Sequence, residues 1–293
     1  AILVKTAGVK KLVAAINKMD DCGWDRERYE SIQKEMKQFL KSVGFSEKEI
    51  VFVPIAGLSG ANMKDPVSAK ECPWYEGKPL FDILDGINIE TKGADGPVRM
   101  PIHDRYREGE TCLLGKLESG TISKGDKLLI MPAASEVVIN SIWIESTQVD
   151  AVRCGELVKL KVKGVTDDQV QSGDVLVPAK TEVRKTTKFV AKVNIIECPS
   201  IYTAGFQCML YAHTLEVSCT LDQVRHILDK KTGKPSSTQL PFLKQGQAAE
   251  VVIACESAIW IESYKDFPQL GRFVLRHDGE TVAVGVVTET LED

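Results

Sequence analysis

The sequence predicts an α/β domain followed by two all-β domains. The prediction rests on a change in the spacing of apolar residues along the chain. Near the N-terminus, two continuous apolar runs flank an amphipathic segment with helical spacing, which is the order of a parallel sheet with a crossover helix. Beyond Gly96, the apolar residues recur in short runs separated by turns, as they do in β-barrels. We therefore predict domains at residues 1–96, 97–183 and 184–293.

The first domain is predicted from a few strongly patterned segments. Residues 12–16 and 50–54 are continuous apolar runs, as expected of parallel strands that are buried on both faces. Between them, the apolar residues from Tyr29 to Val43 fall at helical spacing, and Gly44 ends the helix. Two further helical segments, each closed by a glycine, are predicted at residues 1–7 and 80–84.

The remainder of the chain reads as strands, and their number is sufficient for two closed barrels. In the middle domain we predict strands at residues 111–118, 127–131, 137–144, 157–162 and 175–177. In the last domain we predict strands at residues 189–197, 206–212, 216–229, 248–254, 272–276 and 281–290. The polar stretch at residues 180–188 separates the two sets.

Composition narrows the class of protein. The 293 residues are 43% hydrophobic and 27% charged, which is the balance of a globular protein. The net charge of −4 provides no overall attraction to nucleic acid, so we predict no DNA partner, and any contact with RNA must come from local patches.

The eight cysteines have irregular spacings without a C-x-x-C pair, which favours free thiols in a reducing cytoplasm over disulfides or a metal site. We see neither an apolar run long enough to span a membrane nor a secretory leader, and we predict a cytoplasmic protein. The first residues read as the interior of a longer chain, because the sequence does not begin with Met.

The tetrapeptide Asn17-Lys18-Met19-Asp20 directly follows the first apolar run. Ligands usually bind at the ends of strands in open α/β sheets. A carboxylate at Asp20 accepts hydrogen bonds only, so it can take both the N1–H and the N2 amine of guanine. Lys18 can lie along the base, and Asn17 can contact the base edge or brace the loop. The tetrapeptide therefore predicts a guanine-binding corner.

A second loop follows the second apolar run. Its residues from Ala56 to Leu58 surround Gly57, and a glycine lets the backbone approach a base closely. The complementary phosphate loop, G-x-x-x-x-G-K-[ST], does not occur in the 293 residues. The sequence therefore predicts the guanine-binding half of a nucleotide site without the half that holds the phosphates.

These motifs resemble the translational GTPases of the elongation factor 1 alpha group. The shared stretches include Asn17 to Asp20, Gly57 to Asn62 and Cys72-Pro73-Trp74-Tyr75. A narrower resemblance to the class-2 peptide chain release factors of eukaryotes rests on residues 70–75, 114–120, 158–165, 187–191 and 271–276. The resemblance extends over essentially the whole chain.

The resemblance implies a fold and a nucleotide. The fold is the C-terminal part of an α/β P-loop GTPase domain followed by two all-β barrel domains. GTP or GDP is the implied cofactor, held by Asn17, Lys18 and Asp20 and by the loop from Ala56 through Gly57 to Leu58. The Gly57 N–H is implied to face the guanine O6. Ala56 departs from the serine that is usual there.

The implied Mg²⁺ ligands and catalytic histidine lie upstream of residue 1. We therefore expect no catalytic residue and no metal ligand in this chain. We also expect the chain to lack tight GTP binding and GTPase activity by itself, because two base contacts contribute only a few kcal/mol.

The resemblance also implies partners. The implied partners are the class-1 release factor, which would dock on the last barrel, and the small ribosomal subunit with its RNA, which the middle barrel would face. The docking residues implied are Gly271, Arg272, Phe273 and Arg276. Period-two spacing puts the two arginines on one face of a strand and points Phe273 toward the barrel interior.

Three alternatives stay open. One is the ribosome-rescue GTPase that pairs with Pelota, and another is elongation factor 1 alpha, which carries aminoacyl-tRNA. The third is a pure partner-binding module in which the remnant of the GTPase domain is inert. The choice of partner distinguishes the first two from a release factor, and independence of nucleotide distinguishes the third.

Overall fold

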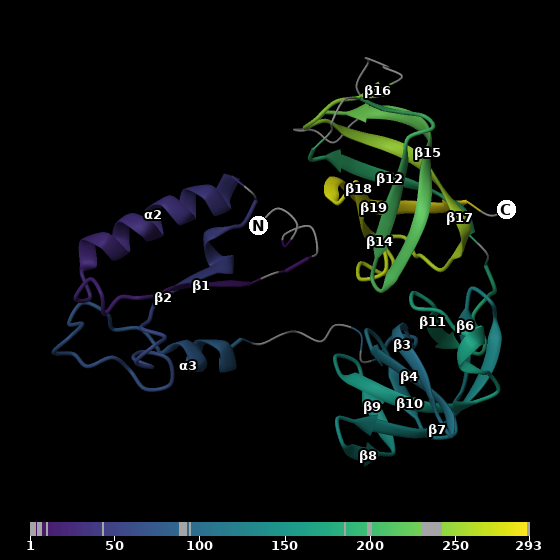
Figure 1. Cartoon of the computed structure of the whole chain (residues 1–293), viewed down its shortest axis with the longest axis horizontal. Helices are drawn as coiled ribbons and strands as arrows, with labels where there is room; N and C mark the ends of the chain where they lie inside the picture. The colour runs from purple at the N-terminus through teal and green to yellow at the C-terminus, as the bar shows by residue number, and fades with distance from the viewer. Residues whose placement is uncertain are drawn as a thin grey trace. The chain divides into compact units, whose positions relative to one another are not determined.

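The computed structural model describes residues 4, 8–9, 11–42, 44–87, 93, 95–184, 186–197, 201–229 and 242–291. Contacts divide the chain into two compact units, Ala1–Glu90 and Thr91–Asp293. The first unit is α/β and the second contains two β-barrels, as Figure 1 shows. The predicted fold class is confirmed in these two units, whereas the domain boundaries stay a prediction.

The first unit is built on a parallel pair of strands. β1 (Leu12–Ile16) and β2 (Ile50–Pro54) match their predicted bounds, and they pair in register from Leu12 opposite Ile50 to Ile16 opposite Pro54. Both strands therefore end at the same edge. Figure 1 shows α2 (Arg26–Ser42) and α3 (Leu80–Asp85) on opposite sides of this pair.

The helix α2 forms because its apolar residues share one face, which buries Tyr29 and Leu40. Glu27 in its first turn and Lys41 in its last turn complement the helix dipole. Gly44 follows the helix with a φ of 100°, a conformation that glycine adopts without strain.

Short elements complete the first unit. A 3₁₀ turn, η1 (Glu47–Glu49), is capped at its N-terminus by a capping box between Ser46 and Glu49, and it leads into β2. The helix α3 ends at Gly86, as predicted. Ten buried residues form the core: Ile16, Met19, Trp24, Tyr29, Leu40, Phe45, Ile50, Phe52, Ala56 and Cys72. The predicted N-terminal helix lies almost entirely outside the described residues.

The first barrel of the second unit closes through a ring of six strands. Their order around the ring is β10, β4, β3, β11, β6 and β7, and β7 pairs back to β10. The bounds of its strands are β3 (Met100–Glu108), β4 (Glu110–Lys116), β5 (Thr121–Ser123), β6 (Lys127–Met131), β7 (Ser135–Ile144), β8 (Thr147–Val149), β9 (Ala151–Arg153), β10 (Leu157–Lys163) and β11 (Val175–Pro178), with a 3₁₀ turn η2 (Asp167–Gln169) before β11.

The second barrel is also closed, in the order β12, β17, β15, β14, β18 and β19, with β19 pairing back to β12. Its strands are β12 (Thr186–Ile195), β14 (Gln207–Ala212), β15 (Leu215–Leu228), β17 (Ala248–Ile259), β18 (Arg272–His277) and β19 (Glu280–Leu291), and a small sheet pairs β13 (Tyr202–Thr203) with β16 (Phe242–Leu243). Within the closed ring of these six strands, each strand is paired on both sides.

An apolar layer joins the two barrels. Four side chains of the first barrel pack against two of the second: Leu129, Met131, Val175 and Val177 against Trp260 and Leu270. Gly173 of the first barrel lies so close to Leu215 that an added Cβ would meet the Leu215 Cα at 2.7 Å. The barrels therefore pack closely enough that only glycine fits there.

Polar contacts border the layer between the barrels. Arg99 forms an ion pair with Glu262, and the two side chains are only 11% and 17% exposed. The Thr214 hydroxyl donates to the Ile102 carbonyl at 2.9 Å. His213 is partly buried, and its Nε2 lies 3.3 Å from the Trp260 carbonyl oxygen. Burial lowers the pKa of His213 to about 4.

All of the predicted barrel strands form, with bounds shifted by a few residues at some ends. The strands missing from the prediction are β3, β5, β8, β9, β13 and β16. The longest of these, β3, has a run of charged and polar residues in its exposed second half, so its alternation is weak. Among the described residues, no helix is long and apolar enough to cross a bilayer.

Candidate functional site

Asn17 joins the two loops that follow β1 and β2. Its Oδ1 accepts the Lys18 N–H at 2.7 Å and the Gly57 N–H at 2.8 Å. Because parallel strands end at one edge, residues that are 40 positions apart in the sequence meet here. Asn17 therefore braces the loops, which was one of the two roles considered for it.

Within the tetrapeptide, Met19 is anchored in the core and the next residue, Asp20, is exposed to solvent. Met19 is 1% exposed and donates its N–H to the Ile55 carbonyl at 3.2 Å, which anchors the loop in the core. Lys18 has a φ of 61°, a left-handed conformation that costs energy in a non-glycine residue. Asp20 is exposed, and the described residues provide no partner for its carboxylate. That carboxylate is free to accept donors from a ligand.

The second loop is folded by its own backbone. The N–H of Ala56 donates to the Ala61 carbonyl at 3.1 Å, and the N–H of Gly60 donates to the Ala56 carbonyl at 2.9 Å. Ala56 is fully buried, whereas Leu58 is fully exposed. Ala56 therefore shapes the loop rather than offering a side chain to a ligand, and its place among the nucleotide contacts stays a prediction. Leu58 is exposed enough to contact one.

The implied role of the Gly57 N–H needs revision. In this structure it donates to the Asn17 side chain at 2.8 Å. A guanine O6 at this position would have to share that N–H or take it from Asn17. A Cβ added to Gly57 would lie 3.3 Å from the Asn17 amide, so the glycine keeps this bridge uncrowded.

Asn62 is a supporting residue whose role the sequence reasoning missed. It is fully buried with a φ of 59°, and its Nδ2 donates to the Pro54 carbonyl at 2.7 Å. Its Oδ1 accepts the Val67 N–H at 3.3 Å. The available signal was an asparagine closing a glycine-rich loop, because asparagine tolerates left-handed backbone.

Aromatic side chains support the tetrapeptide loop from within the first unit. The Trp74 indole N–H donates to the Trp24 carbonyl at 2.7 Å, and the Trp74 ring packs on Tyr29 at a centroid distance of 5.0 Å. Burial is the main reason that the pKa of Tyr29 is raised to about 12. The Cys72-Pro73-Trp74-Tyr75 stretch therefore contributes to packing.

The predicted partner-binding strand is β18, and of the four residues predicted to dock a partner only the two arginines keep exposed surface. Phe273 is 2% exposed and packs edge to face on Phe189. Gly271 is also buried, and a Cβ there would overlap the Tyr264 backbone. These two residues pack the barrel, and their predicted part in docking a partner stays a prediction.

Arg272 and Arg276 point away from the barrel interior. The Arg272 guanidinium lies 5.0 Å from the centre of the Tyr264 ring and donates to the Tyr264 hydroxyl at 3.0 Å. Arg276 lies 5.7 Å from the centre of the Tyr211 ring and is exposed. Each arginine is thus oriented by an aromatic ring, and together they present positive charge on one barrel wall.

Three family models match the chain in the order of its domains. The Elongation factor Tu GTP binding domain matches residues 1–127, Elongation factor Tu domain 2 matches residues 110–177, and the GTP-eEF1A C-terminal domain-like family matches residues 188–288. The α/β unit and the two barrels therefore follow the domain order of elongation factors.

Two curated relatives carry the name "Eukaryotic peptide chain release factor GTP-binding subunit". The protein of Kluyveromyces lactis is 39% identical over 297 residues, covering 100% of this chain and 42% of the relative. The protein of Zygosaccharomyces rouxii is 40% identical over 296 residues, covering 100% of this chain and 45% of the relative. The chain thus spans less than half the length of these two relatives.

A crystal structure of sup35 complexed with GDP is 34% identical with a TM-score of 0.66, and the match covers 99% of this chain and 72% of that chain. The chain belongs to the family of release factor GTP-binding subunits. A second structure of this family, sup35 complexed with GMPPNP, has the same identity, TM-score and coverage. The predicted resemblance is therefore confirmed, and the family has the elongation-factor-like domains described above.

Proposed function

We propose that this protein acts in translation termination as a GTP-hydrolysing subunit that forms a complex with a class-1 release factor. The single observation that carries the proposal is the braced loop pair at the end of β1 and β2, which leaves the Asp20 carboxylate free, in a chain of this family. Termination is proposed because the curated relatives are named for it.

Asp20 carries the proposed choice of base. Its two carboxylate oxygens can accept the N1–H and the N2 amine of guanine, whereas adenine offers no such pair of donors. Asn17 keeps Asp20 and the Gly57 loop at a fixed separation through its two hydrogen bonds. Lys18 and Leu58 are both exposed and flank the place where the base would lie.

The residues of this chain fit the base of GTP or GDP and offer nothing comparable for its phosphates. The 293 residues contain no phosphate-loop motif, and no cluster of metal-ligating side chains occurs among the described residues. We therefore propose that this chain alone binds guanine nucleotides weakly and does not hydrolyse GTP. In the whole protein, Mg²⁺ would neutralise the phosphate charge.

The docking surface we propose for the class-1 factor is the outer wall of β14 and β18. Arg272 and Arg276 supply its charge, and Tyr211 and Tyr264 supply flat apolar area. Arginine and tyrosine are the residue types that most often dominate interface energy. An acidic surface on the class-1 factor would match this wall.

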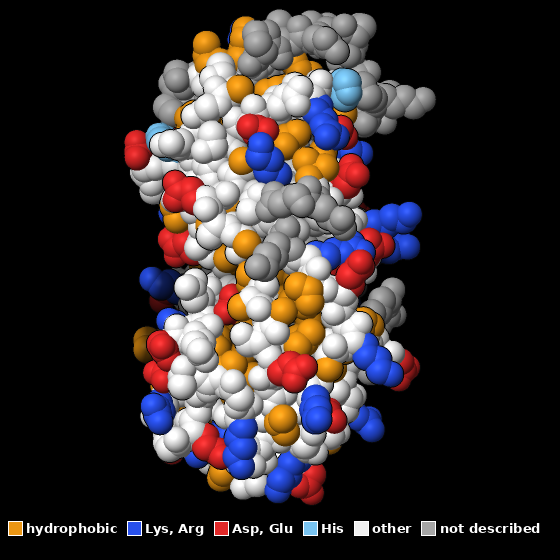
Figure 2. Space-filling view, turned by 90° about the vertical axis from the view of Figure 1, so that its right-hand side faces the viewer, with side chains coloured by type: hydrophobic (Ala, Val, Ile, Leu, Met, Phe, Trp, Pro, Cys, Tyr) orange, Lys and Arg blue, Asp and Glu red, His pale blue; other side chains and the backbone are white. Residues whose placement is uncertain are grey.

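The ribosomal contacts are proposed to be local. Figure 2 shows lysine and arginine interspersed with aspartate and glutamate over one face, without a broad region of a single sign. Contacts of the first barrel with the small ribosomal subunit and its RNA would then rest on individual basic side chains. A role in translation implies a cytoplasmic location.

Calorimetric titration of a eukaryotic class-1 release factor into this chain, without nucleotide, tests the proposal. We expect saturable binding that Arg272→Glu weakens at least about tenfold, the loss expected for a hot-spot charge. Arg153→Glu is the matched control, because Arg153 is exposed on β9 of the other barrel, and it should leave the affinity unchanged.

Binding to a different partner would indicate a different function. Binding to Pelota in place of the class-1 factor would indicate ribosome rescue, and binding to aminoacyl-tRNA would indicate an elongation factor. Binding that requires added GTP would contradict the idea that the isolated chain is a nucleotide-independent partner-binding module.

The nucleotide half of the proposal has its own test. Titration with GDP, followed through the amide NMR signals of Asp20 and Gly57, should give shifts that do not saturate at micromolar concentrations. Asp20→Ala should abolish the shifts, and ADP should not cause them. Saturable micromolar binding of GTP would refute weak binding by this chain.

A further inference from the structure

Three cysteines form a row across neighbouring strands of the second barrel. Cys208 on β14 is directly opposite Cys219 on β15, and Cys219 is opposite Cys255 on β17. All three belong to the apolar core, with exposed fractions of 8%, 2% and 9%. The Sγ atoms of Cys208 and Cys219 are hydrogen-bonded at 3.5 Å. No hydrogen bond or disulfide joins Cys255 to this pair within the described part of the chain.

The backbone around the first pair suits a disulfide. Directly opposed residues of antiparallel strands have Cα atoms about 4.5–5.5 Å apart, and disulfides form at Cα separations of about 4.4–6.8 Å. The two sulfur atoms already face each other. Small side-chain rotations would therefore bring them into bonding distance, and the strands would keep their register.

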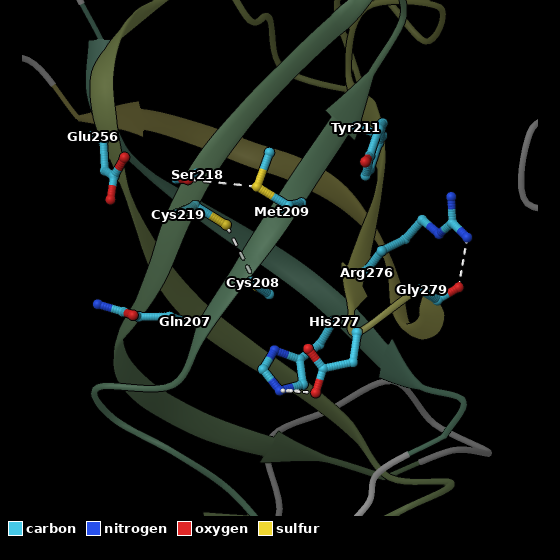
Figure 3. Close-up of a pocket in the computed structure, with 11 residues that line it drawn as sticks. Gln207, Cys208, Met209, Tyr211, Ser218, Cys219, Glu256, Arg276, His277 and Gly279 are labelled. Carbon is cyan, nitrogen blue, oxygen red and sulfur yellow. Dashed lines mark hydrogen bonds and ion pairs between the residues drawn. The ribbon is translucent and has the colours of Figure 1, made fainter.

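A pocket lies beside the pair. It has a volume of about 340 Å³, and both Cys208 and Cys219 belong to its lining. Polar side chains of Gln207 and Arg276 also line it (Figure 3). A water molecule occupies about 30 Å³ in the liquid, so a molecule as small as hydrogen peroxide has ample room.

We propose that Cys208 and Cys219 are a reversible oxidation site that forms an intramolecular disulfide with a peroxide. The free-thiol state of both residues is the reduced form of this site. The proposal concerns the second barrel alone and does not depend on the nucleotide proposed above, although the pocket shares Tyr211 and Arg276 with the wall proposed for docking.

The two thiols have different roles in the reaction. With Cys219 as the donor, the hydrogen bond between the two thiols lowers the pKa of Cys208 against the opposing effect of burial, and it raises the pKa of Cys219. Cys208 is also the more exposed of the two, at 8% against 2%, so we assign it as the thiolate that attacks and Cys219 as the resolving thiol. Burial raises the pKa of Cys255 to about 12, which makes that thiol a poor nucleophile.

The chemistry balances in two steps. The Cys208 thiolate attacks one peroxide oxygen, the O–O bond breaks, and the hydroxide that leaves takes up a proton to become water. The Cys219 sulfur then attacks the sulfenic acid sulfur of Cys208, and the S–O bond breaks. The departing hydroxyl leaves as water with the Cys219 proton. Two thiols give up two electrons, and one peroxide is reduced to two waters.

Peptide mapping of the unmodified chain after treatment with hydrogen peroxide tests this directly. Cleavage after glutamate at positions 197, 216 and 250 separates the two cysteines, because Cys208 lies in peptide 198–216 and Cys219 in peptide 217–250. We expect these two peptides to appear linked, with the loss of two hydrogen atoms and the bond located at Cys208. A thiol reductant should separate them again.

The alternatives give different products. A bond from Cys219 to Cys255 would link peptide 217–250 to 251–256, and a bond to Cys198 would be located by fragmentation of peptide 198–216. Either result, or sulfinic acid at Cys208 without any linkage, would overturn the proposal.

Two variants check the assigned roles. Cys208→Ser should abolish the linked peptides, whereas Cys255→Ser, a substitution in the same core, should leave their yield unchanged. Cys219→Ser should let the sulfenic acid accumulate at Cys208, detectable by trapping with dimedone. Formation of the link in the Cys208→Ser variant would contradict the proposal, and circular dichroism verifies that each variant is folded.

Discussion

The two compact units hold their functional residues by different means. In the first unit, a two-stranded sheet supports loops that are tied by side-chain amides of Asn17 and Asn62. In the second unit, the strand β18 is hydrogen-bonded on both sides and its apolar residues are buried in a closed barrel. The nucleotide candidates are thus loop residues, and the partner candidates are the outward residues of a rigid strand.

Apolar side chains are also less completely buried in the first unit than in the barrels. In the first unit, Phe39, Phe81 and Leu84 are 54%, 43% and 46% exposed, so the described strands and helices leave part of their apolar faces uncovered. In the barrels, inward side chains such as Phe189 and Leu210 have no exposed surface. The comparison teaches that a change in a loop brace acts on the first unit locally, whereas a change in a barrel wall acts on its whole core.

The largest effect is expected for Phe273→Ala. The substitution removes a ring that packs edge to face on Phe189 in the barrel core, and such truncations cost about 3–5 kcal/mol. Hydrogen exchange followed by mass spectrometry should show faster exchange throughout the second barrel and no change in the first unit. The neighbouring Arg272→Ala should cost at most about 1 kcal/mol. Equal effects of the two variants would break the comparison.

The second effect is a pH dependence of stability that arises from histidine. Only the second unit should show it, because the four histidines all lie beyond residue 96: His103, His213, His226 and His277. The folded pKa of His213 is about 4, below the ordinary value of 6.5. The unfolded chain therefore binds the extra proton between these values, and stability falls as pH drops through this window. The full loss is about 3 kcal/mol, at about 1.4 kcal/mol per pKa unit.

Denaturant titrations between pH 7 and pH 4 measure this loss. The control is His213→Asn, because asparagine tolerates the φ of 42° at this position. The difference in slope between the two proteins isolates the histidine from the carboxylates. If the variant has the same slope, then His213 takes up its proton in the folded barrel as readily as in the unfolded chain, which would contradict the lowered pKa.

A third, smaller effect is expected for Asn62→Ala. It leaves the buried Pro54 carbonyl and the Val67 N–H without their partner, which costs about 1–3 kcal/mol. Amide exchange should accelerate in the Gly57 loop and in β2, while the barrels keep their protection. Loss of protection in the barrels would contradict the independence of the two units.

The smallest effect is expected for Asn17→Ala. The two hydrogen bonds that it removes are exposed, so the cost in stability is about 1 kcal/mol. The Gly57 amide should nevertheless exchange markedly faster, and the GDP-induced shifts at Asp20 should weaken. Asn17→Asp keeps the accepting oxygen and should retain the protected Gly57 amide. An unaffected Gly57 amide in Asn17→Ala would refute the bracing role.

Sequence patterns predicted strand bounds and side-chain orientation well, because each of these patterns has a single physical cause. The continuous apolar runs predicted β1 and β2 with their observed bounds. Period-two spacing correctly oriented Phe273 inward and Arg272 outward. The tetrapeptide was correctly placed at the end of β1, although β1 is only half-buried and Met19 of the tetrapeptide lies in the core.

Contacts between distant residues were decided by the tertiary structure alone. The Asn17 side chain meets the Gly57 N–H because β1 and β2 pair in parallel, and a sequence shows neither the register nor the hydrogen-bond partner. The same holds for the packing of Gly173 against Leu215 between the barrels. Cys208 and Cys219 oppose each other only because the register of β14 and β15 makes them neighbours. Side-chain periodicity reports which face a residue occupies, whereas strand order and register determine what it touches there.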